Sequence, residues 1–305
     1  MGQVIGIDIG GTNFRLGCVA EDGELSHFEM KSSAPLLKAG AWEVLSREIL
    51  NYMNRYSLEG EVEAVAVGIP SAVSKDKSFV YSTPNLKGLE NMDLGHLLER
   101  SLGIRVFVDR DVNYLLCHDI KKYGLDPDRD KTILGMYLGT GLGNAIYICG
   151  NFHAGRNGVA GELGHIPFYH IKEACPCGNE GCVELRCSGA HLQRICNKHY
   201  PNTDIGEIFT RHRDENPVRE FLDYLAYPIS TEITILDPDY VVMGGGVMTM
   251  RDFPMDYLIR QVKKRARHPY PSENLRFVFP EHTQASGVSG GGLAAYEGLK
   301  KCKKI

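Results

Sequence analysis

Hydrophobic residues along the chain form short runs that end at glycines, a pattern typical of buried strands followed by turns. The first run, Val4–Ile9, stops at Gly10-Gly11-Thr12-Asn13, and hydrophobic residues resume over 14–19. A second copy begins at 133–138, passes through the glycine-rich stretch 139–143 and resumes at 145–149. Each copy predicts a strand, a turn and a second strand, and the repeat predicts two similarly built halves.

Amphipathic helices are predicted where hydrophobic residues recur every three or four positions. Residues 216–236 follow this pattern but contain Pro228, where we expect a kink or a boundary. Asp237-Pro238 should end this helix, and the strand-like run Tyr240–Met243 then leads into a third glycine cluster, Gly244-Gly245-Gly246. The remaining predicted helices cover about 42–56, 90–102, 112–124, 189–199, 254–267 and 288–301.

The glycine turns differ from two common nucleotide-binding motifs. A dinucleotide-binding Gly-x-Gly-x-x-Gly opens a helix, whereas both turns here lead into strand-like sequence. The chain also has no Gly-Lys-Ser/Thr phosphate-binding sequence. Paired strand–turn–strand loops are how actin-like ATPases bind phosphates, through backbone N–H groups. Two ordinary hairpins remain the alternative.

Composition and charge limit the kinds of function that the protein can have. The 305 residues are enough for two domains, and a net charge of −4 offers no basic surface for nucleic acid or anionic membranes. We expect no signal peptide, because Asp8 interrupts the first hydrophobic run. Residues 132–155 carry no charge but are rich in glycine and contain asparagine, so we interpret them as strands and the protein as soluble and cytoplasmic.

A histidine and three cysteines lie close together in the second half of the chain. His165 ends the run Gly-Glu162-Leu-Gly-His, and Cys175, Cys177 and Cys182 follow, with Glu184 two residues after the last of them. Four such ligands suit a closed tetrahedral zinc site, which would hold the loop 165–184 still rather than catalyse. Free or disulfide-bonded cysteines are the alternative. Nine cysteines, an odd number, favour a reducing compartment.

These motifs together resemble the ROK family of sugar kinases and sugar-responsive repressors. The resemblance rests on the Gly-Glu-x-Gly-His run, Cys-x-Cys-Gly-x-x-Gly-Cys-x-Glu, Asp8-Ile-Gly-Gly-Thr-Asn13, Pro84-Asn85, Asp111 and the later glycine clusters, and it covers nearly the whole chain. It implies an α/β fold of two actin-like (ribonuclease H-like) ATPase domains with a cleft between them and a zinc-stapled loop in the second. We expect domains at 1–120, joined by a terminal helix at about 288–305 that packs on the first half, and at 121–287. A homodimer acting on a small-molecule hexose is also expected.

Phosphoryl transfer to a sugar needs a base, a cation and a phosphate cradle. Asp111 follows a strand-like run and occupies the position of the family's catalytic Asp; capping of the following helix is the alternative role, and Asp109 is the competing candidate. Asp8 would face the phosphates of ATP through Mg²⁺. Gly290–Gly292, with the third glycine cluster, suit close approach of an adenosine. Residues expected to bind the nucleotide are Asp8, Gly10, Gly11, Thr12, Asn13, Gly139, Thr140, Gly141, Leu142, Gly143, Gly244, Gly245 and Gly246.

The sugar site is assembled from polar residues on both sides of the expected cleft. His165 would bind zinc through one ring nitrogen and the sugar through the other. Arg110 stands where the family commonly has Asn, and this replacement, with the sequence around it, resembles the D-allose kinase branch. The substrate-binding residues are expected to be Asn85, Arg110, Asp111, Glu162, His165 and Glu184.

The same motifs leave other functions as alternatives. Glucokinase and N-acetylmannosamine kinase of the same family are the nearest alternatives to an ATP-dependent D-allose 6-kinase. A sugar-responsive repressor would carry a helix-turn-helix domain before the first glycine motif, which here begins at Asp8. A glycoside hydrolase using Glu162 and Glu184 would leave the three glycine clusters unexplained.

Overall fold

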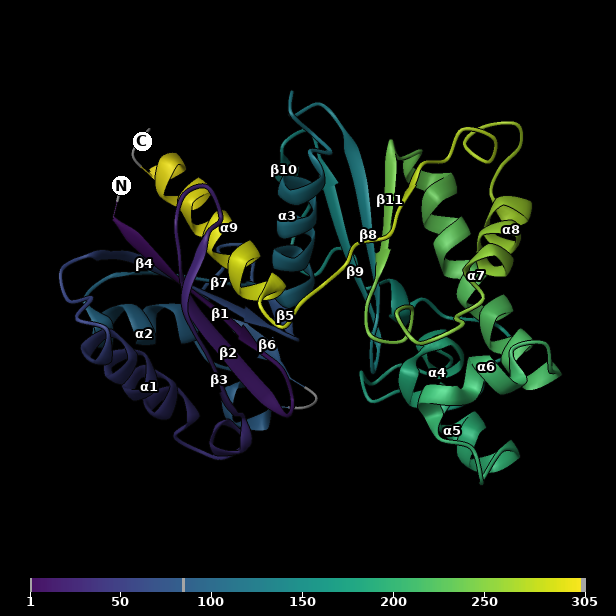
Figure 1. Ribbon diagram of the computed structural model, residues 1–305, viewed down its shortest axis with the longest axis horizontal. Coiled ribbons are helices and arrows are strands. Elements are labelled where there is room, and N and C mark those ends of the chain that lie inside the picture. Colours follow the sequence, from purple (N-terminus) through teal and green to yellow (C-terminus); the bar gives the residue numbers. More distant parts are fainter. Residues whose placement is uncertain (1, 84–85, 303–305) are drawn as a thin grey trace. The chain divides into compact units, whose positions relative to one another are not determined.

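The computed structural model describes residues 2–83 and 86–302, which form two compact units (Figure 1). Unit 1 contains the chain up to Leu125, the segment Ala154–Ala160 and the chain from His282 onward, and unit 2 contains Asp126–His153 and Gly161–Glu281. The chain therefore passes between the units four times. The division expected from the sequence is simpler, since it places 154–160 in the second half.

Unit 1 is built on a mixed sheet of order β3-β2-β1-β4-β7. β1 and β2 form an antiparallel hairpin around the first glycine turn, as predicted, whereas β1, β4 and β7 are parallel. Asp8, Gly68 and Asp109 are neighbours in register near the C-terminal ends of these parallel strands. The strands are β1 (Gln3–Ile9), β2 (Asn13–Val19), β3 (Leu25–Ser32), β4 (Val62–Ile69) and β7 (Arg105–Arg110), beside the small pair β5 (Ala72–Val73) and β6 (Val80–Ser82).

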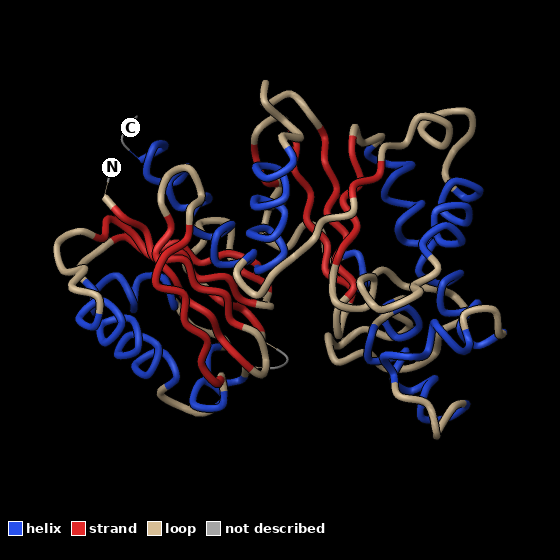
Figure 2. The backbone as a smooth tube through the Cα atoms, in the orientation of Figure 1, coloured by secondary structure: helices blue, strands red, loops and turns tan. Residues whose placement is uncertain are grey.

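Helices cover both faces of this sheet (Figure 2). Alternate residues of β1 point to opposite faces: Ile5 and Ile7 belong to a buried cluster with Leu45 of α1, while Val4 belongs to another with Tyr296 of α9. This alternation is why the strand is hydrophobic on both sides. The helices are α1 (Ala41–Arg55), α2 (Leu94–Leu102), α3 (Asp111–Tyr123) and α9 (Ser286–Cys302), with short 3₁₀ turns η1 (Ala34–Leu37) and η2 (Lys87–Leu89).

The C-terminal helix α9 packs against α3 and β1 of unit 1 with its glycines at the contact. A Cβ atom on Gly290 would lie 1.8 Å from the Tyr114 carbonyl oxygen, and one on Gly292 would lie 2.4 Å from Val19. Gly290–Gly292 are all buried. The suggestion that these glycines approach an adenosine is therefore wrong, because they allow the helix to approach the sheet closely.

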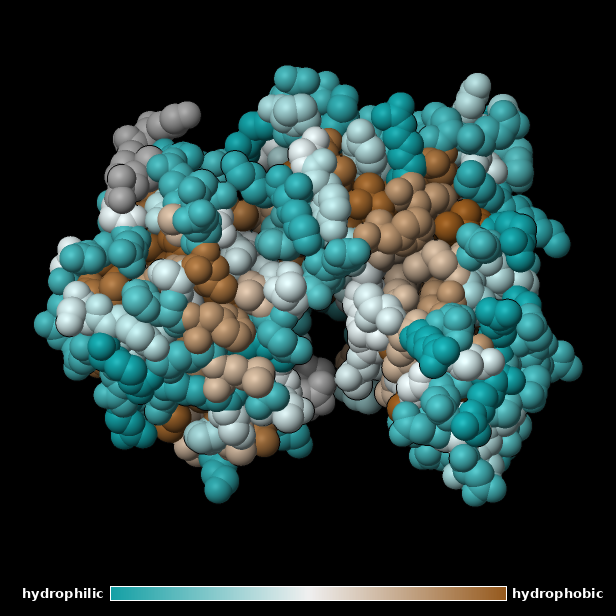
Figure 3. Space-filling view, viewed as in Figure 1, coloured by the Kyte–Doolittle hydropathy of each residue, from teal (hydrophilic) through white to brown (hydrophobic). Residues whose placement is uncertain are grey.

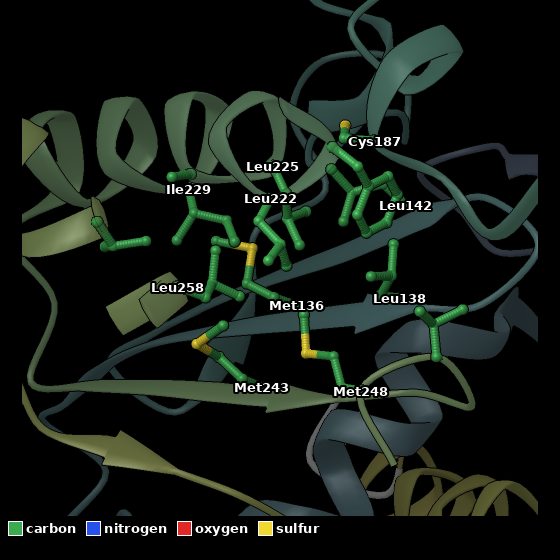
Figure 4. Close-up of a cluster of buried hydrophobic side chains, with 14 of the residues drawn as sticks. Met136, Leu138, Leu142, Cys187, Leu222, Leu225, Ile229, Met243, Met248 and Leu258 are labelled. Atoms are coloured by element: carbon green, nitrogen blue, oxygen red, sulfur yellow. The ribbon is translucent and has the colours of Figure 1, made fainter. Parts of the chain in front are cut away.

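Unit 2 repeats the arrangement with a sheet of order β10-β9-β8-β11-β12. β8 and β9 form the second predicted hairpin, in which Leu138 pairs with Leu142, and β11 is parallel to β8. Leu222, Leu225 and Ile229 of α7 face Met136 and Met243 of the sheet (Figure 4). The strands are β8 (Thr132–Leu138), β9 (Leu142–Ile148), β10 (Asn151–Phe152), β11 (Tyr240–Gly244) and β12 (Phe277–Val278).

The helices of unit 2 follow the sequence pattern except at Pro228. α7 is continuous from Asn216 to Leu236, so the expected boundary at Pro228 is wrong: the proline lies buried against the core inside the helix. α7 ends before Asp237, as the sequence predicted, and Asp237 adopts a left-handed conformation. The helices are α4 (Glu184–Cys187), α5 (Gly189–His199), α6 (Ile208–His212), α7 (Asn216–Leu236) and α8 (Met255–Arg265), with η3 (Leu163–His165) and η4 (Ile205–Glu207).

Surface and helix composition add two observations. On the face drawn in Figure 3, hydrophilic residues predominate in both units and hydrophobic residues gather in patches among them. Among the residues described, no helix combines the length and the apolar character needed to cross a membrane.

Candidate active site

Two carboxylates meet at the C-terminal edge of the parallel strands of unit 1. Asp8 lies near the end of β1, and Asp111 is the first residue of α3, directly after β7. Between them lies Gly68 of β4, where a Cβ atom would come 2.9 Å from the Tyr114 ring and 3.5 Å from the Asp111 Cα atom. A larger residue at position 68 would therefore push α3, which carries Asp111, away from the sheet.

Burial and the neighbouring negative charge of Asp111 raise the pKa of Asp8 to about 6, and the positive charge of Arg15 opposes the rise. Arg15 Nη1 lies 3.5 Å from Asp8 Oδ2 and its side chain also donates to Gln284. Two close carboxylates repel each other unless a cation lies between them, so this pair suits Mg²⁺.

Arg15 was missed by the sequence analysis. Asp8 and Arg15 pair directly across the β1–β2 hairpin. Counting outward from the glycine turn would have found this pair, since residues opposite each other in a hairpin lie close together.

The competing candidate, Asp109, is engaged inside the protein. Its side chain is nearly fully buried; Oδ2 lies 2.6 Å from Lys77 Nζ, and Oδ1 accepts from Asn113 Nδ2 at 2.8 Å. Oδ1 also accepts from the Arg110 backbone N–H. Asp109 thus has a cation and two donors of its own, and Asp111 is the better placed candidate for a base.

Asp111 also interacts with the start of its own helix. Its Oδ1 accepts from the Val112 backbone N–H at 2.8 Å, while Arg110 holds the capping position without a side-chain cap. The capping alternative therefore has some basis, because a carboxylate in the first turn is favoured by the helix dipole.

Arg110 contacts a segment that is distant in the sequence. Its side chain is buried, and Nη1 donates to the Ala160 carbonyl oxygen at 2.7 Å. Ala160 ends the segment 154–160, in which Gly158 packs so tightly on Val73 that a Cβ atom would lie 2.0 Å from its carbonyl oxygen. Arg110 thus holds the residue that directly precedes Gly161 and Glu162.

The first glycine turn belongs to unit 1 and the second to unit 2. In the first, Gly10 N–H donates to Asn13, and the N–H groups of Gly11 and Thr12 make no hydrogen bond to any residue that the structure describes. Free N–H groups at a turn are suited to bind phosphate oxygens. In the second turn the Leu142 N–H donates to Glu184 Oε2 at 2.8 Å. This N–H group is therefore already hydrogen-bonded to the protein.

The third glycine cluster follows β11. A Cβ atom on Gly245 would lie 2.5 Å from the backbone of Leu138, and its φ of 97° favours glycine. Gly246 has open space beside it. Gly245 is thus required by packing against β8, and Gly246 is the position with room for a ligand.

The predicted metal ligands converge in unit 2. Nδ1 of His165 lies 3.7 Å from the Cys175 sulfur, the Cys177 and Cys182 sulfurs lie 3.6 Å apart, and all four ligand atoms lie within 4.8 Å of one another. Zn–S bonds of about 2.3 Å in a tetrahedron place sulfur atoms roughly 3.8 Å apart. The residues therefore fit a tetrahedral zinc ion. Burial raises the pKa of the Cys182 thiol to about 12, so a bound cation is what would keep it as a thiolate.

The two nitrogens of His165 face different groups. Nδ1 faces the cysteines, whereas Nε2 lies 3.8 Å from Glu162 Oε2. The structure thus brings Glu162 and His165 together beside the cluster, with both side chains about one third exposed. Asn85, the remaining predicted sugar ligand, lies outside the described residues.

The fold and these sites define a protein of the two-domain, actin-like class of phosphotransferases. A model of the ROK family matches residues 4–296, and the chain belongs to the ROK family. A glucokinase of Thermotoga maritima is 28% identical over 265 residues, 80% of this chain and 82% of the relative. An N-acetyl-D-glucosamine kinase of Vibrio cholerae is 27% identical over 314 residues, 97% and 99% of the two chains.

Solved structures agree with this assignment. The crystal structure of a ROK family glucokinase from Streptomyces griseus, in complex with glucose and AMPPNP, is similar with a TM-score of 0.78 and 25% identity. The similarity covers 97% of this chain and all of that one. The resemblance to the family is confirmed, whereas the D-allose kinase branch has no counterpart among these relatives.

Proposed function

We propose that the protein is an ATP-dependent hexose kinase that transfers the γ-phosphoryl group to the 6-hydroxyl of a free hexose, and that the hexose is D-allose. The observation that carries the kinase proposal is the pair of carboxylates, Asp8 and Asp111, at one edge of a sheet whose first hairpin ends in free N–H groups. Phosphoryl transfer needs a base, a cation site and a phosphate cradle together.

Each part of the site has a role in this proposal. Asp111 accepts the proton of the attacking hydroxyl, and Arg110 and Asn85 contact the sugar side. The glycine turns bind the phosphates of ATP, and Gly246 leaves room for the adenosine. Asp8 would hold Mg²⁺, which when bound neutralises charge on the phosphates.

The metal cluster has a structural role in the proposal. His165, Cys175, Cys177 and Cys182 would bind one Zn²⁺ and use all four of its positions, which leaves none for catalysis. The ion would fix the orientation of the His165 ring, whose Nε2 then faces the sugar together with Glu162 and Glu184.

The choice of D-allose rests on Arg110. This residue replaces the Asn common in the family, and it places a buried guanidinium, bonded to the Ala160 carbonyl oxygen, directly before Asp111. A site that hydrogen-bonds a hydroxyl discriminates against an epimer that leaves its polar groups unpaired. D-Allose differs from D-glucose only in the orientation of one such hydroxyl, at C3.

A coupled ADP-release assay over a panel of hexoses tests the proposal. We expect ATP- and Mg²⁺-dependent turnover with D-allose, slower turnover with D-glucose and N-acetylmannosamine, and a product phosphorylated at O6 by phosphorus-31 NMR. Hexose binding without ADP release would favour a sugar-responsive repressor instead. We further propose a homodimer, which light scattering after size-exclusion chromatography would test.

A further inference from the structure

The second glycine turn, residues 139–143, which binds phosphate in the proposed function and is called the phosphate turn below, is held in place by the segment that follows the metal cluster. The Gly189 N–H donates to the Gly139 carbonyl oxygen at 2.9 Å, and the Ala190 N–H donates to that of Thr140 at 3.0 Å. The third bond is the one from the Leu142 N–H to Glu184 Oε2. The residues 184–190 therefore attach to the turn at three points.

Glycines allow this close contact. A Cβ atom on Gly141 would lie 2.5 Å from Glu184 Oε2, and one on Gly164 would lie 3.1 Å from the same oxygen. On Gly189 it would lie 2.3 Å from the Gly139 carbonyl oxygen. The Glu184 carboxylate thus fills a space that two glycines leave open, between the turn and η3.

The backbone on both sides of the contact is fixed by the core. Glu184 is the first residue of α4, and Cys187 of the same short helix is fully buried in the cluster that contains Leu142 (Figure 4). Cys182, two residues before Glu184, belongs to the metal cluster. The carboxylate is therefore carried by a segment that is anchored at both ends.

Only one of the two carboxylate oxygens is used. Glu184 Oε2 accepts from Leu142, and Oε1 makes no hydrogen bond to any of the described residues. A partly buried carboxylate with one engaged and one available oxygen can accept from two different partners at once.

From these contacts we infer that Glu184 couples hexose binding to the nucleotide site. A hexose hydroxyl that donates to Oε1 fixes the carboxylate, and Oε2 then holds the Leu142 N–H, and with it the phosphate turn, in one conformation. Glu184 is in this respect a positioning residue for the nucleotide. The inference rests on the proposed kinase function. It predicts that a bound hexose increases the affinity for the nucleotide, and that a bound nucleotide increases the affinity for the hexose by the same factor.

Isothermal titration calorimetry of the full-length protein tests the coupling. AMPPNP, together with Mg²⁺, is titrated into the protein without hexose and with a saturating hexose that the protein phosphorylates. The ratio used below is the AMPPNP dissociation constant without hexose divided by that with hexose. We expect a ratio of about 5 or more for the native protein. In Glu184→Gln the ratio should fall to within about twofold of 1, because the NH2 group that replaces one carboxylate oxygen donates and cannot accept from the hexose hydroxyl while the amide oxygen binds Leu142.

Three further variants separate coupling from other effects. Glu180→Gln changes an exposed carboxylate of the same loop and should keep the native ratio. Glu162→Gln changes another predicted sugar ligand, which precedes η3, and should weaken hexose binding yet keep the ratio at saturation. Gly164→Ala keeps the carboxylate but crowds it, and should lower the ratio without changing any charge.

The possible outcomes decide between the two proposals. The coupling is overturned if the native ratio is near 1 while hexose phosphorylation is normal. It is also overturned if Glu184→Gln keeps the native ratio. Either result leaves the kinase proposal intact. If the native protein does not phosphorylate any hexose, the proposed function itself is wrong. Should Glu184→Gln fail to fold by circular dichroism, the ratio of Gly164→Ala decides.

Discussion

At the scale of single residues, the two aspartates at the end of β7 have different surroundings. Asp109 points into the protein, where Lys77 and Asn113 bind it, whereas Asp111 begins a helix and its negative charge adds to burial in raising the pKa of Asp8. Two residues along the chain are enough to reverse the direction of a side chain where a strand becomes a helix. Their roles can therefore be separated by substitution.

Asp111→Asn should keep the fold but remove the base. General-base catalysis typically contributes about 10²- to 10⁴-fold in rate, so we expect kcat to fall by this factor while hexose binding is retained. Steady-state kinetics together with calorimetric hexose binding measures both. A variant with more than about half of the native kcat would place the base elsewhere.

Asp109→Asn is the matched comparison. It leaves Lys77 without its anionic partner, so we expect a loss of stability on the order of 1–3 kcal/mol and a smaller loss of kcat than for Asp111→Asn. Urea unfolding and the same kinetic assay measure the two effects. A larger kcat loss in Asp109→Asn would exchange the roles of the two residues.

The pKa of Asp8 predicts how stability depends on pH. This pKa is raised from 3.8 to about 6, so the folded protein binds the proton more tightly than the unfolded chain does. The ionised Asp8 therefore lowers stability above pH 6, and this cost disappears as the pH falls toward 3.8. Asp111 and Arg15 are the charged groups that act on it.

In the absence of Mg²⁺, Asp8→Asn should unfold at higher urea than the native protein at pH 8. We expect a difference in unfolding free energy on the order of 1–3 kcal/mol, which should shrink at pH 4.5. Adding Mg²⁺ at pH 8 should stabilise the native protein and not the variant. An equal difference at both pH values would contradict the raised pKa of Asp8.

At the scale of elements, the loop 165–184 has little regular secondary structure, and only a few of its residues, such as Phe168 and Val183, pack against the core of unit 2. It contains isolated bridges between Pro167 and Cys182 and between Ala174 and Glu180 but no long strand. A metal ion that binds a folded loop contributes its binding free energy to folding. The ion is therefore expected to decide whether Glu162, His165 and Glu184 are held in place.

Cys177→Ser should release zinc and weaken hexose binding together. We expect about one equivalent of zinc in the native protein by elemental analysis, and loss of most of it in the variant. Cys149→Ser, which changes an exposed cysteine outside the cluster, should affect neither measurement. Native protein purified without chelators that contains no zinc would contradict the zinc site.

At the scale of the whole molecule, the proposed specificity involves segments that come from distant parts of the sequence. Arg110 from the end of β7 binds Ala160, which belongs to unit 1 although the chain on both sides of segment 154–160 belongs to unit 2. In the proposed sugar site, replacing Arg110 would therefore change the position of segment 154–160 as well as the local charge.

We predict a higher kcat/KM for D-allose than for D-glucose, and a smaller ratio in Arg110→Asn. The loss of one hydrogen bond of the buried guanidinium costs on the order of 1–3 kcal/mol, so the ratio should change by about fivefold or more. Steady-state kinetics on both sugars measures it, with Arg110→Lys as the variant that keeps the charge. A native preference for glucose or N-acetylmannosamine would reject D-allose and leave the kinase proposal in place.

The sequence by itself determined the repeated strand–turn–strand units, most helices and which four residues form the candidate metal cluster. These features depend on local periodicity, on glycine, and on ligands close together along the chain. Small errors arose at element ends: the helix expected from about residue 90 begins at Leu94, because Asp93 caps it and Met92 bridges to Val80.

Only the tertiary structure decided which groups meet across large distances in the chain. The return of 154–160 to unit 1, the bond from Arg110 to Ala160, and the burial of Asp109 beside Lys77 have no local signal. The same is true of Glu184, whose contact with Leu142 spans 42 residues. Such contacts depend on how sheets and helices pack, and a packing contact leaves no periodic trace in either of the segments that form it.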